Sequence, residues 1–291
     1  MDVANRHLSA LPREDLDFIV RTVVKRRTDY DEIRNIIQGK ADLIDVMLDD
    51  ERLFRRTMAD EEAILRLSPF LLFTILIRKV HRDLKNTTFT IEPVGKRERL
   101  PIFDAPRVVE LLDNEDVRSY LADMLSSFTR VGTTTLYFKD GRAFSKRTFS
   151  DVDLDDVLEL AEILPEDSKF SLYKRAGDIC LFLTGVYPDY IFSQVAEESS
   201  SHRTQGESRK VRDMADYERE GQMFYRQAAS HKMAKVVGMD RVLSVLSESF
   251  TLARKPLTII AERYVTSKRD QWFKAWPAFG AGTASGAGTT T

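Results

Sequence analysis

The apolar and polar positions of this chain are organised around its most apolar stretch, residues 64–84. No residue between Arg66 and Arg78 carries a charge. A helix that is apolar on every side must be buried on every side. A bilayer requires about 20 apolar residues, whereas a run of about 10–14 is typical of a buried core helix. We therefore expect a core helix here, capped by Ser68 and begun by Pro69.

Apolar residues at helical spacing recur on both sides of this stretch. Residues 11–27, 29–38 and 43–54 each repeat the pattern, which predicts a helical array around the apolar helix over residues 1–85. Further helices are expected at residues 104–112, 117–128, 153–164, 170–185, 211–237, 239–253 and 257–273. Gly238 is expected to end one of them, and Pro256 to separate the last two.

The spacing of apolar residues changes from helical to alternating in two places. Residues 87–91 are β-branched and aromatic, and residues 100–103 can return beside them. Residues 133–138 and 142–149 flank an Asp140-Gly141 turn, which is a strong hairpin signal. The expected fold is therefore mainly α: a multi-helix globular array with one small antiparallel β-hairpin or sheet.

No linker composition interrupts the middle of the chain. We expect a single predominantly helical domain over residues 1–279, with a mobile loop near 197–210, where large apolar residues are absent. Aromatic residues at 272–279 are expected to pack on this domain. Residues 280–291 contain only Gly, Ala, Ser and Thr and are expected to be a flexible tail.

Composition limits the possible partners and the compartment. The chain is 43% hydrophobic and 31% charged, which is globular rather than disordered. Its net charge of −2 gives no overall attraction to nucleic acid, which makes nucleic-acid binding an unfavoured interpretation. A single cysteine, Cys180, favours a reducing compartment. Because no signal-peptide pattern and no membrane span is recognised, a cytoplasmic location is expected.

Recognisable catalytic and metal-binding motifs are missing from the sequence. The four histidines, His7, His81, His202 and His231, lack the spacings of a zinc site. The acidic residues at 151–162 resemble a calcium loop, but Asp156 stands where that loop requires glycine. No metal site is therefore predicted, and no cofactor is identified. We also expect His81 at a solvated helix end and Cys180 in the core.

Two predicted helices carry glycine at a spacing of four residues. One helix presents Tyr217, Gly221 and Tyr225 on one face, and the other presents Gly177, Leu181 and Gly185. Glycine inside a helix costs about 1 kcal/mol, so it usually has a local reason. We expect either that the two faces pack closely or that a flat ligand lies between them.

The ligand alternative adds polar residues to these faces. In that interpretation Tyr217 and Tyr225 would form the walls of a pocket, and Arg175 or Asp178 would anchor the ligand.

Three function classes remain open. The first is a soluble helical interaction or regulatory protein, with a protein partner or self-association. The others are a binder of an apolar small molecule or cofactor, and an enzyme whose site is not visible in the sequence.

Overall fold

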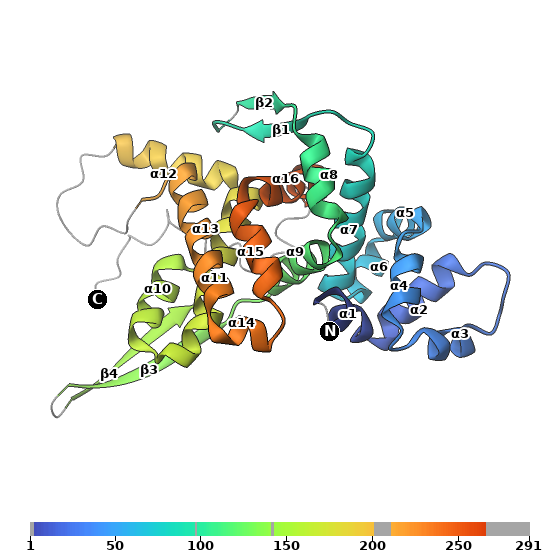
Figure 1. Cartoon of the computed structure of the whole chain (residues 1–291), viewed down its shortest axis with the longest axis horizontal. Coiled ribbons are helices and arrows are strands. Elements are labelled where there is room, and N and C mark those ends of the chain that lie inside the picture. The colour runs from blue at the N-terminus through green and yellow to red at the C-terminus, as the bar shows by residue number, and fades with distance from the viewer. Residues whose placement is uncertain (1–2, 97, 141–142, 201–210, 266–291) are drawn as a thin grey trace, which may run out of the picture.

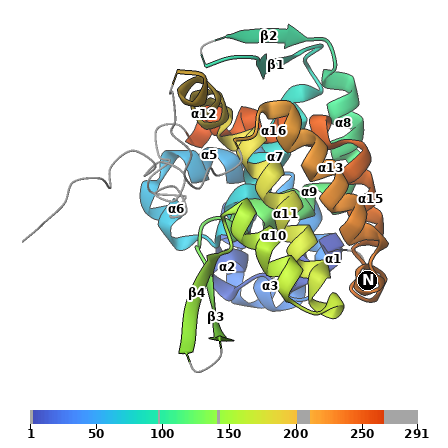
Figure 2. The same cartoon turned by 90° about the vertical axis from the view of Figure 1, so that its left-hand side faces the viewer.

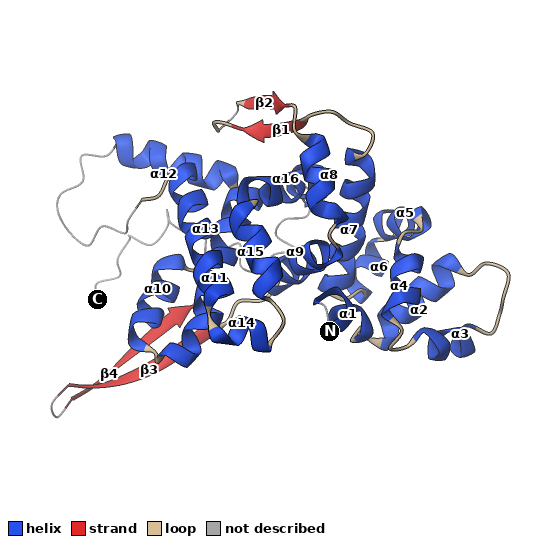
Figure 3. Ribbon diagram, in the orientation of Figure 1, coloured by secondary structure: helices blue, strands red, loops and turns tan. Residues whose placement is uncertain are grey.

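The computed structural model describes residues 3–96, 98–140, 143–200 and 211–265, and helices make up most of them (Figure 1). Within these ranges, the β structure consists of two antiparallel two-stranded ribbons (Figure 3). The expected mainly α fold is confirmed. The expected hairpin at 133–149 forms one of these ribbons, and the strand expected at 87–91 belongs to the other rather than joining it.

Short amphipathic helices form the N-terminal part of the fold. Their apolar faces meet in one hydrophobic cluster, in which Ile19, Val20 and Ile44 are inaccessible to solvent. These helices are α1 (Val3–Ser9), α2 (Arg13–Val23), α3 (Tyr30–Ile37), α4 (Ala41–Leu48) and α5 (Glu51–Ala59). The next short helix, α6 (Glu61–Arg66), places Ile64 in a second hydrophobic cluster.

The predicted apolar helix is α7 (Pro69–Leu84), and its N-terminal cap is confirmed. The Ser68 hydroxyl accepts the Leu71 N–H at 3.1 Å. A buried carboxylate, Asp15, accepts the backbone N–H of Ser68 at 2.9 Å and holds this cap against α2. The start of α7 is thereby fixed by a contact that local sequence does not reveal.

Helix α7 belongs to two hydrophobic clusters at once. Leu71 and Ile75 pack into the N-terminal cluster, while Phe73, Leu76 and Ile77 pack into a larger cluster formed with the later helices. All five side chains are buried. The all-round apolar pattern is therefore explained by burial between two clusters rather than in lipid.

The first ribbon follows α7. Strand β1 (Thr90–Pro93) pairs with β2 (Arg99–Ile102), with Thr90 opposite Ile102. The strand begins later than expected, because the Thr87 N–H bonds to the Leu84 carbonyl in a turn that closes α7. Helices α8 (Ala105–Asp113) and α9 (Glu115–Ser127) come next.

The second ribbon is the hairpin predicted by the Asp-Gly turn. Strand β3 (Thr133–Asp140) pairs with β4 (Ala143–Ser150), with Thr133 opposite Ser150. The two ribbons lie at opposite ends of the molecule (Figure 2). Helices α10 (Leu154–Ile163), α11 (Glu166–Val186) and α12 (Pro188–Ser200) follow. Asp153 caps α10 by accepting the N–H groups of Asp155 and Asp156.

Three expected boundaries in the second half of the chain are wrong. Residues 197–200, expected in a loop, complete α12, and 201–210 lie outside the described residues. The helix expected at 211–237 divides at His231, whose extended backbone and ring cap the second piece. The observed helices are α13 (Met214–Ser230) and α14 (Lys232–Val236). Gly238, at φ 68°, follows α14 as expected.

The third wrong boundary is Pro256. This proline lies inside α16 (Phe250–Ile260), and the break falls instead at Ser249, after α15 (Asp240–Glu248). Burial of Leu257 and Ile260 outweighs the hydrogen bond that proline removes. A π-helical turn, Ala261–Val265, continues α16. The aromatic residues at 272–279 and the tail lie outside the described residues.

In the described part of the chain, no single helix has both the length and the apolar composition needed to cross a membrane. Helices α11 and α12 meet those criteria only as a pair, with a bend of 91° between them.

Candidate functional site

The two glycine faces identified in the sequence meet in the core. Helices α11 and α13 lie side by side, and a Cβ added at Gly177 would come within 2.7 Å of the Tyr225 ring. A Cβ at Gly221 would come within 2.4 Å of the Phe250 ring and 2.9 Å of Cys180. Protein side chains therefore fill the space beside both glycines. Leu181, four residues after Gly177 on α11, is also inaccessible to solvent.

Asp178 lies at the centre of a buried polar network on these faces. It accepts the hydroxyls of Tyr120 at 2.7 Å and Tyr225 at 2.9 Å, and Lys174 lies 2.9 Å from its other oxygen. Burial, with the nearby Asp178 carboxylate, raises the pKa of both tyrosines well above the ordinary value. The hydroxyls therefore stay protonated as donors. The network is internally satisfied, which is typical of a structural core element.

The remaining residues of the predicted ligand site lie elsewhere. Gly185 faces Leu257 of α16. Arg175 binds the Asp151 carbonyl and the Ser127 hydroxyl, and its guanidinium lies 4.0 Å from the Phe128 ring centre. Tyr217 is buried with Arg212 over its ring. The structure thus brings together Gly177, Asp178, Leu181, Gly221 and Tyr225 but not the other three, and ligand binding stays a prediction.

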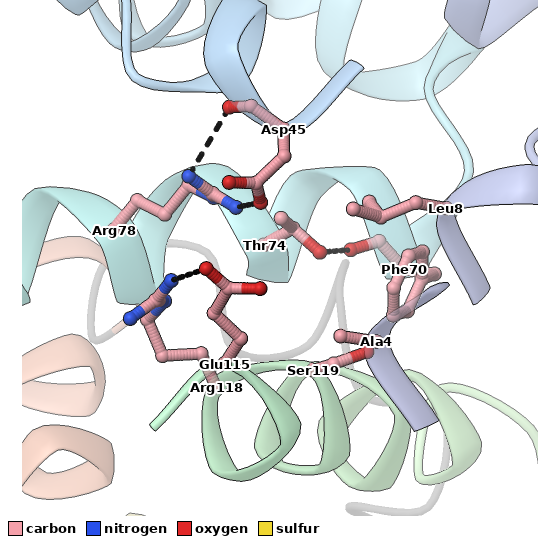
Figure 4. A pocket seen from close by; sticks show the side chains of 9 residues that line it. All are labelled: Ala4, Leu8, Asp45, Phe70, Thr74, Arg78, Glu115, Arg118 and Ser119. Atoms are coloured by element: carbon pink, nitrogen blue, oxygen red, sulfur yellow. Dashed lines mark hydrogen bonds and ion pairs between the residues drawn. The ribbon is translucent and has the colours of Figure 1, made fainter. Parts of the chain in front are cut away.

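A small cavity lies between α1, α4, α7 and α9 (Figure 4). Arg78 and Arg118 line it, and Arg78 is ion-paired with Asp45 and Asp49. Its volume of about 20 Å³ is close to that of one water molecule. The cavity is thus too small for an organic ligand, and the ion pairs of Arg78 join α7 to α4. Among the described residues, no group of three or more His, Cys, Asp or Glu side chains is placed to hold a metal ion.

The most unusual surface feature is the outward face of the β1–β2 ribbon. Six of the 14 large hydrophobic residues that are exposed in the described chain fall within residues 89–103. Strand alternation places Phe89, Ile91, Pro101 and Phe103 on one side of the ribbon, and Phe103 is 79% exposed. Leu100 and Ile102 lie on the other side and are 50% and 37% exposed. The Phe89 and Phe103 rings contact edge to face, with centroids 6.1 Å apart. We call these four residues the ribbon patch.

The opposite side of this ribbon is fixed to the protein by buried charges. Glu92 pairs with Arg254 and, at 2.9 Å, with Lys255, while Lys255 also contacts Asp104 at 2.5 Å. Burial alone would raise the pKa of Glu92, but the two cations outweigh it and lower that pKa.

A third cation anchors the other strand. Arg99 of β2 reaches Glu262 at 2.9 Å and Asp189 at 3.3 Å. The ribbon patch is therefore displayed on a firmly held element rather than on a loose loop.

Sequence reasoning did not select the ribbon patch, although a signal was present. Residues 87–103 contain apolar residues at positions that alternate across both faces of a short hairpin. A two-stranded ribbon that packs on a helix can bury one face only. Apolar residues on the other face are then exposed, which is a mark of an interaction site.

Comparisons with models of protein families, with curated proteins and with solved structures found no match to this chain.

Proposed function

We propose that this protein is a non-enzymatic interaction protein and that it binds a protein partner through the ribbon patch. The observation that supports this function is the concentration of exposed apolar side chains on a rigid ribbon. An exposed apolar patch of this kind is typical of a protein-binding surface. Of the two hollows described, the one between α1, α4, α7 and α9 is too small for an organic ligand. The other, about 390 Å³ between the β3–β4 ribbon and α10, holds Arg147 and Glu159 in an ion pair with each other, so we favour the interaction class over the enzyme class.

The chemistry of the patch indicates the chemistry of the partner. Phe89, Ile91, Pro101 and Phe103 carry no charge, so the matching surface must be apolar at its centre.

Site-specific photo-crosslinking tests this function. The photoreactive residue benzoylphenylalanine is introduced at Phe103 and, as a control, at Val236, which is 75% exposed on α14. Each variant is irradiated in the cells that naturally produce the protein. We expect one discrete protein adduct from position 103, none from position 236, and loss of the adduct when Ile91→Asp is added.

Two results would overturn the proposal. One is equal crosslinking at positions 103 and 236, because adducts would then reflect exposure alone. The other is the absence of a protein adduct combined with co-sedimentation of the parent protein with phosphatidylglycerol vesicles. That combination would assign the ribbon patch to a membrane surface. Thermal unfolding of each variant verifies that the fold is retained.

A cytoplasmic location is part of this proposal. It is supported by the single cysteine, Cys180, which is buried and therefore unsuited to a disulfide with another chain.

A further inference from the structure

The second ribbon carries an unpaired strand edge of unusual composition. Residues 133–138 of β3 are three threonines followed by Leu136, Tyr137 and Phe138. This run has high β-propensity, no charge, no proline and no glycine, a composition typical of strands that pair with other strands. In the described part of the chain, β3 pairs with β4 alone.

The backbone pattern shows which groups point away from β4. The Asp151 N–H bonds to the Gly132 carbonyl at 3.0 Å, just before the first paired residues. Hydrogen-bonded and non-hydrogen-bonded pairs alternate along an antiparallel ladder. The N–H and C=O groups of Thr133, Thr135, Tyr137 and Lys139 therefore point to the outer edge of β3.

The outer edge of β4 is protected, in contrast to that of β3. The same alternation turns the Ser150 N–H outward, and the Asp156 carboxylate of α10 accepts it at 2.8 Å. Arg147 forms an ion pair with Glu159 of α10. Lys146 and Arg147 also place two adjacent positive charges on this strand, a common protection against edge pairing.

We propose that two copies of this chain pair along the outer edges of β3 and form a four-stranded antiparallel sheet. A two-fold axis at Leu136 places Thr135 opposite Tyr137 of the other copy and Thr133 opposite Lys139. This register joins outward-pointing backbone groups to one another over the strand. It also brings no two like charges opposite each other, whereas β4 paired with β4 would oppose Lys146 and Arg147.

Pairing with a second copy would also stabilise the β3–β4 ribbon by adding strands to it. An isolated two-stranded ribbon is marginal in water and requires further strands or packing against a helix for stability. Within one chain, the packing of Phe149 and the ion pair of Arg147 secure only the base and middle of β4. This proposal is independent of the partner proposed for the ribbon patch, because it uses the other ribbon.

A proline substitution tests whether the outer edge of β3 forms the contact between the two copies. Tyr137→Pro removes an N–H that points outward, so the bonds between β3 and β4 remain. Tyr137→Thr keeps that N–H and serves as the matched control. Light scattering across the micromolar range should give twice the chain mass of 33.4 kDa for the parent and for Tyr137→Thr. Tyr137→Pro should give a single chain mass.

Disulfide trapping tests the register. Leu136 would face its own counterpart in a non-hydrogen-bonded pair, with Cα atoms about 4.5 Å apart, which a disulfide can span. Leu136→Cys should therefore form a covalent dimer on mild oxidation. The control Ser145→Cys is exposed on β4 and should not. Burial raises the pKa of the native Cys180 thiol, which keeps it unreactive.

A parent protein that is a monomer throughout the concentration series would overturn the proposal. A dimer that persists in Tyr137→Pro would also overturn it, since the contact would then lie elsewhere. Circular dichroism and thermal unfolding of each variant separate loss of pairing from loss of folding.

Discussion

The absence of a side chain at Gly221 allows α13 to pack closely against α11 and α16. A methyl group there would lie 2.4 Å from the Phe250 ring, which is itself inaccessible to solvent. We expect Gly221→Ala to lower the free energy of unfolding by about 1–3 kcal/mol, because overpacking outweighs the gain in helix propensity. Urea denaturation measures this change.

Gly95→Ala provides the control for that substitution. Its added methyl group would lie 3.4 Å from Glu98, an ordinary contact, and its unfolding free energy should change by less than about 0.5 kcal/mol. If the two variants were equally stable, α13 would have room to move away from Phe250.

Residue-level predictions succeeded where the cause is local. Ser68 caps α7 and Cys180 is buried, as their flanking residues indicated, although the Asp15 contact that holds this cap against α2 has no local signal. His81 was wrongly expected in solvent: it is buried, and its ring nitrogen lies 2.9 Å from Asp113, a residue 32 positions away. No sequence pattern near His81 identifies that partner.

At the scale of elements, buried charges hold the β1–β2 ribbon on α16. We expect Lys255→Met to lower the free energy of unfolding by about 3–5 kcal/mol, because Asp104 would lose its buried cation and Glu92 would lose one of its two. Amide hydrogen exchange of residues 90–92, 99, 100 and 102 should accelerate more than that of α9. This local readout distinguishes release of the ribbon from general destabilisation.

The surface pair of Lys232 and Asp167 offers a matched control. Both side chains are largely exposed, so Lys232→Met should change stability by less than about 1 kcal/mol and leave exchange in the ribbon unchanged. Similar losses in the two variants would mean that the buried cluster is no stronger than a surface ion pair.

Element boundaries were predictable where the sequence contains a recognisable turn or capping residue at the end of the element. The hairpin at 133–150 followed from its Asp-Gly turn, and α10 from its cap at Asp153. Pro256 was misjudged because its local preference is overridden by burial of the helix around it. The ribbon patch was missed for a related reason: strand residues alone do not show which face another helix covers.

At the scale of the whole molecule, two histidines whose pKa is lowered in the fold link stability to pH. Burial, aided by the charges of Lys85 and Arg118, lowers the pKa of His81 below its ordinary 6.5, although Asp113 opposes this shift. Burial likewise lowers the pKa of His7, which contacts Ser119 across the α1–α9 contact. Below pH 6.5 the unfolded chain therefore binds more protons at these sites than the folded chain.

The free energy of unfolding is consequently expected to fall as pH drops through the folded-state pKa values of these histidines. His81→Gln keeps a neutral polar side chain at this position and removes one of the two titrating groups. We expect its stability to decline less steeply below pH 6.5 than that of the parent, as measured by urea denaturation at a series of pH values. Equal slopes would mean that His81 takes up its proton in the folded state, and that Asp113 rather than burial controls its charge.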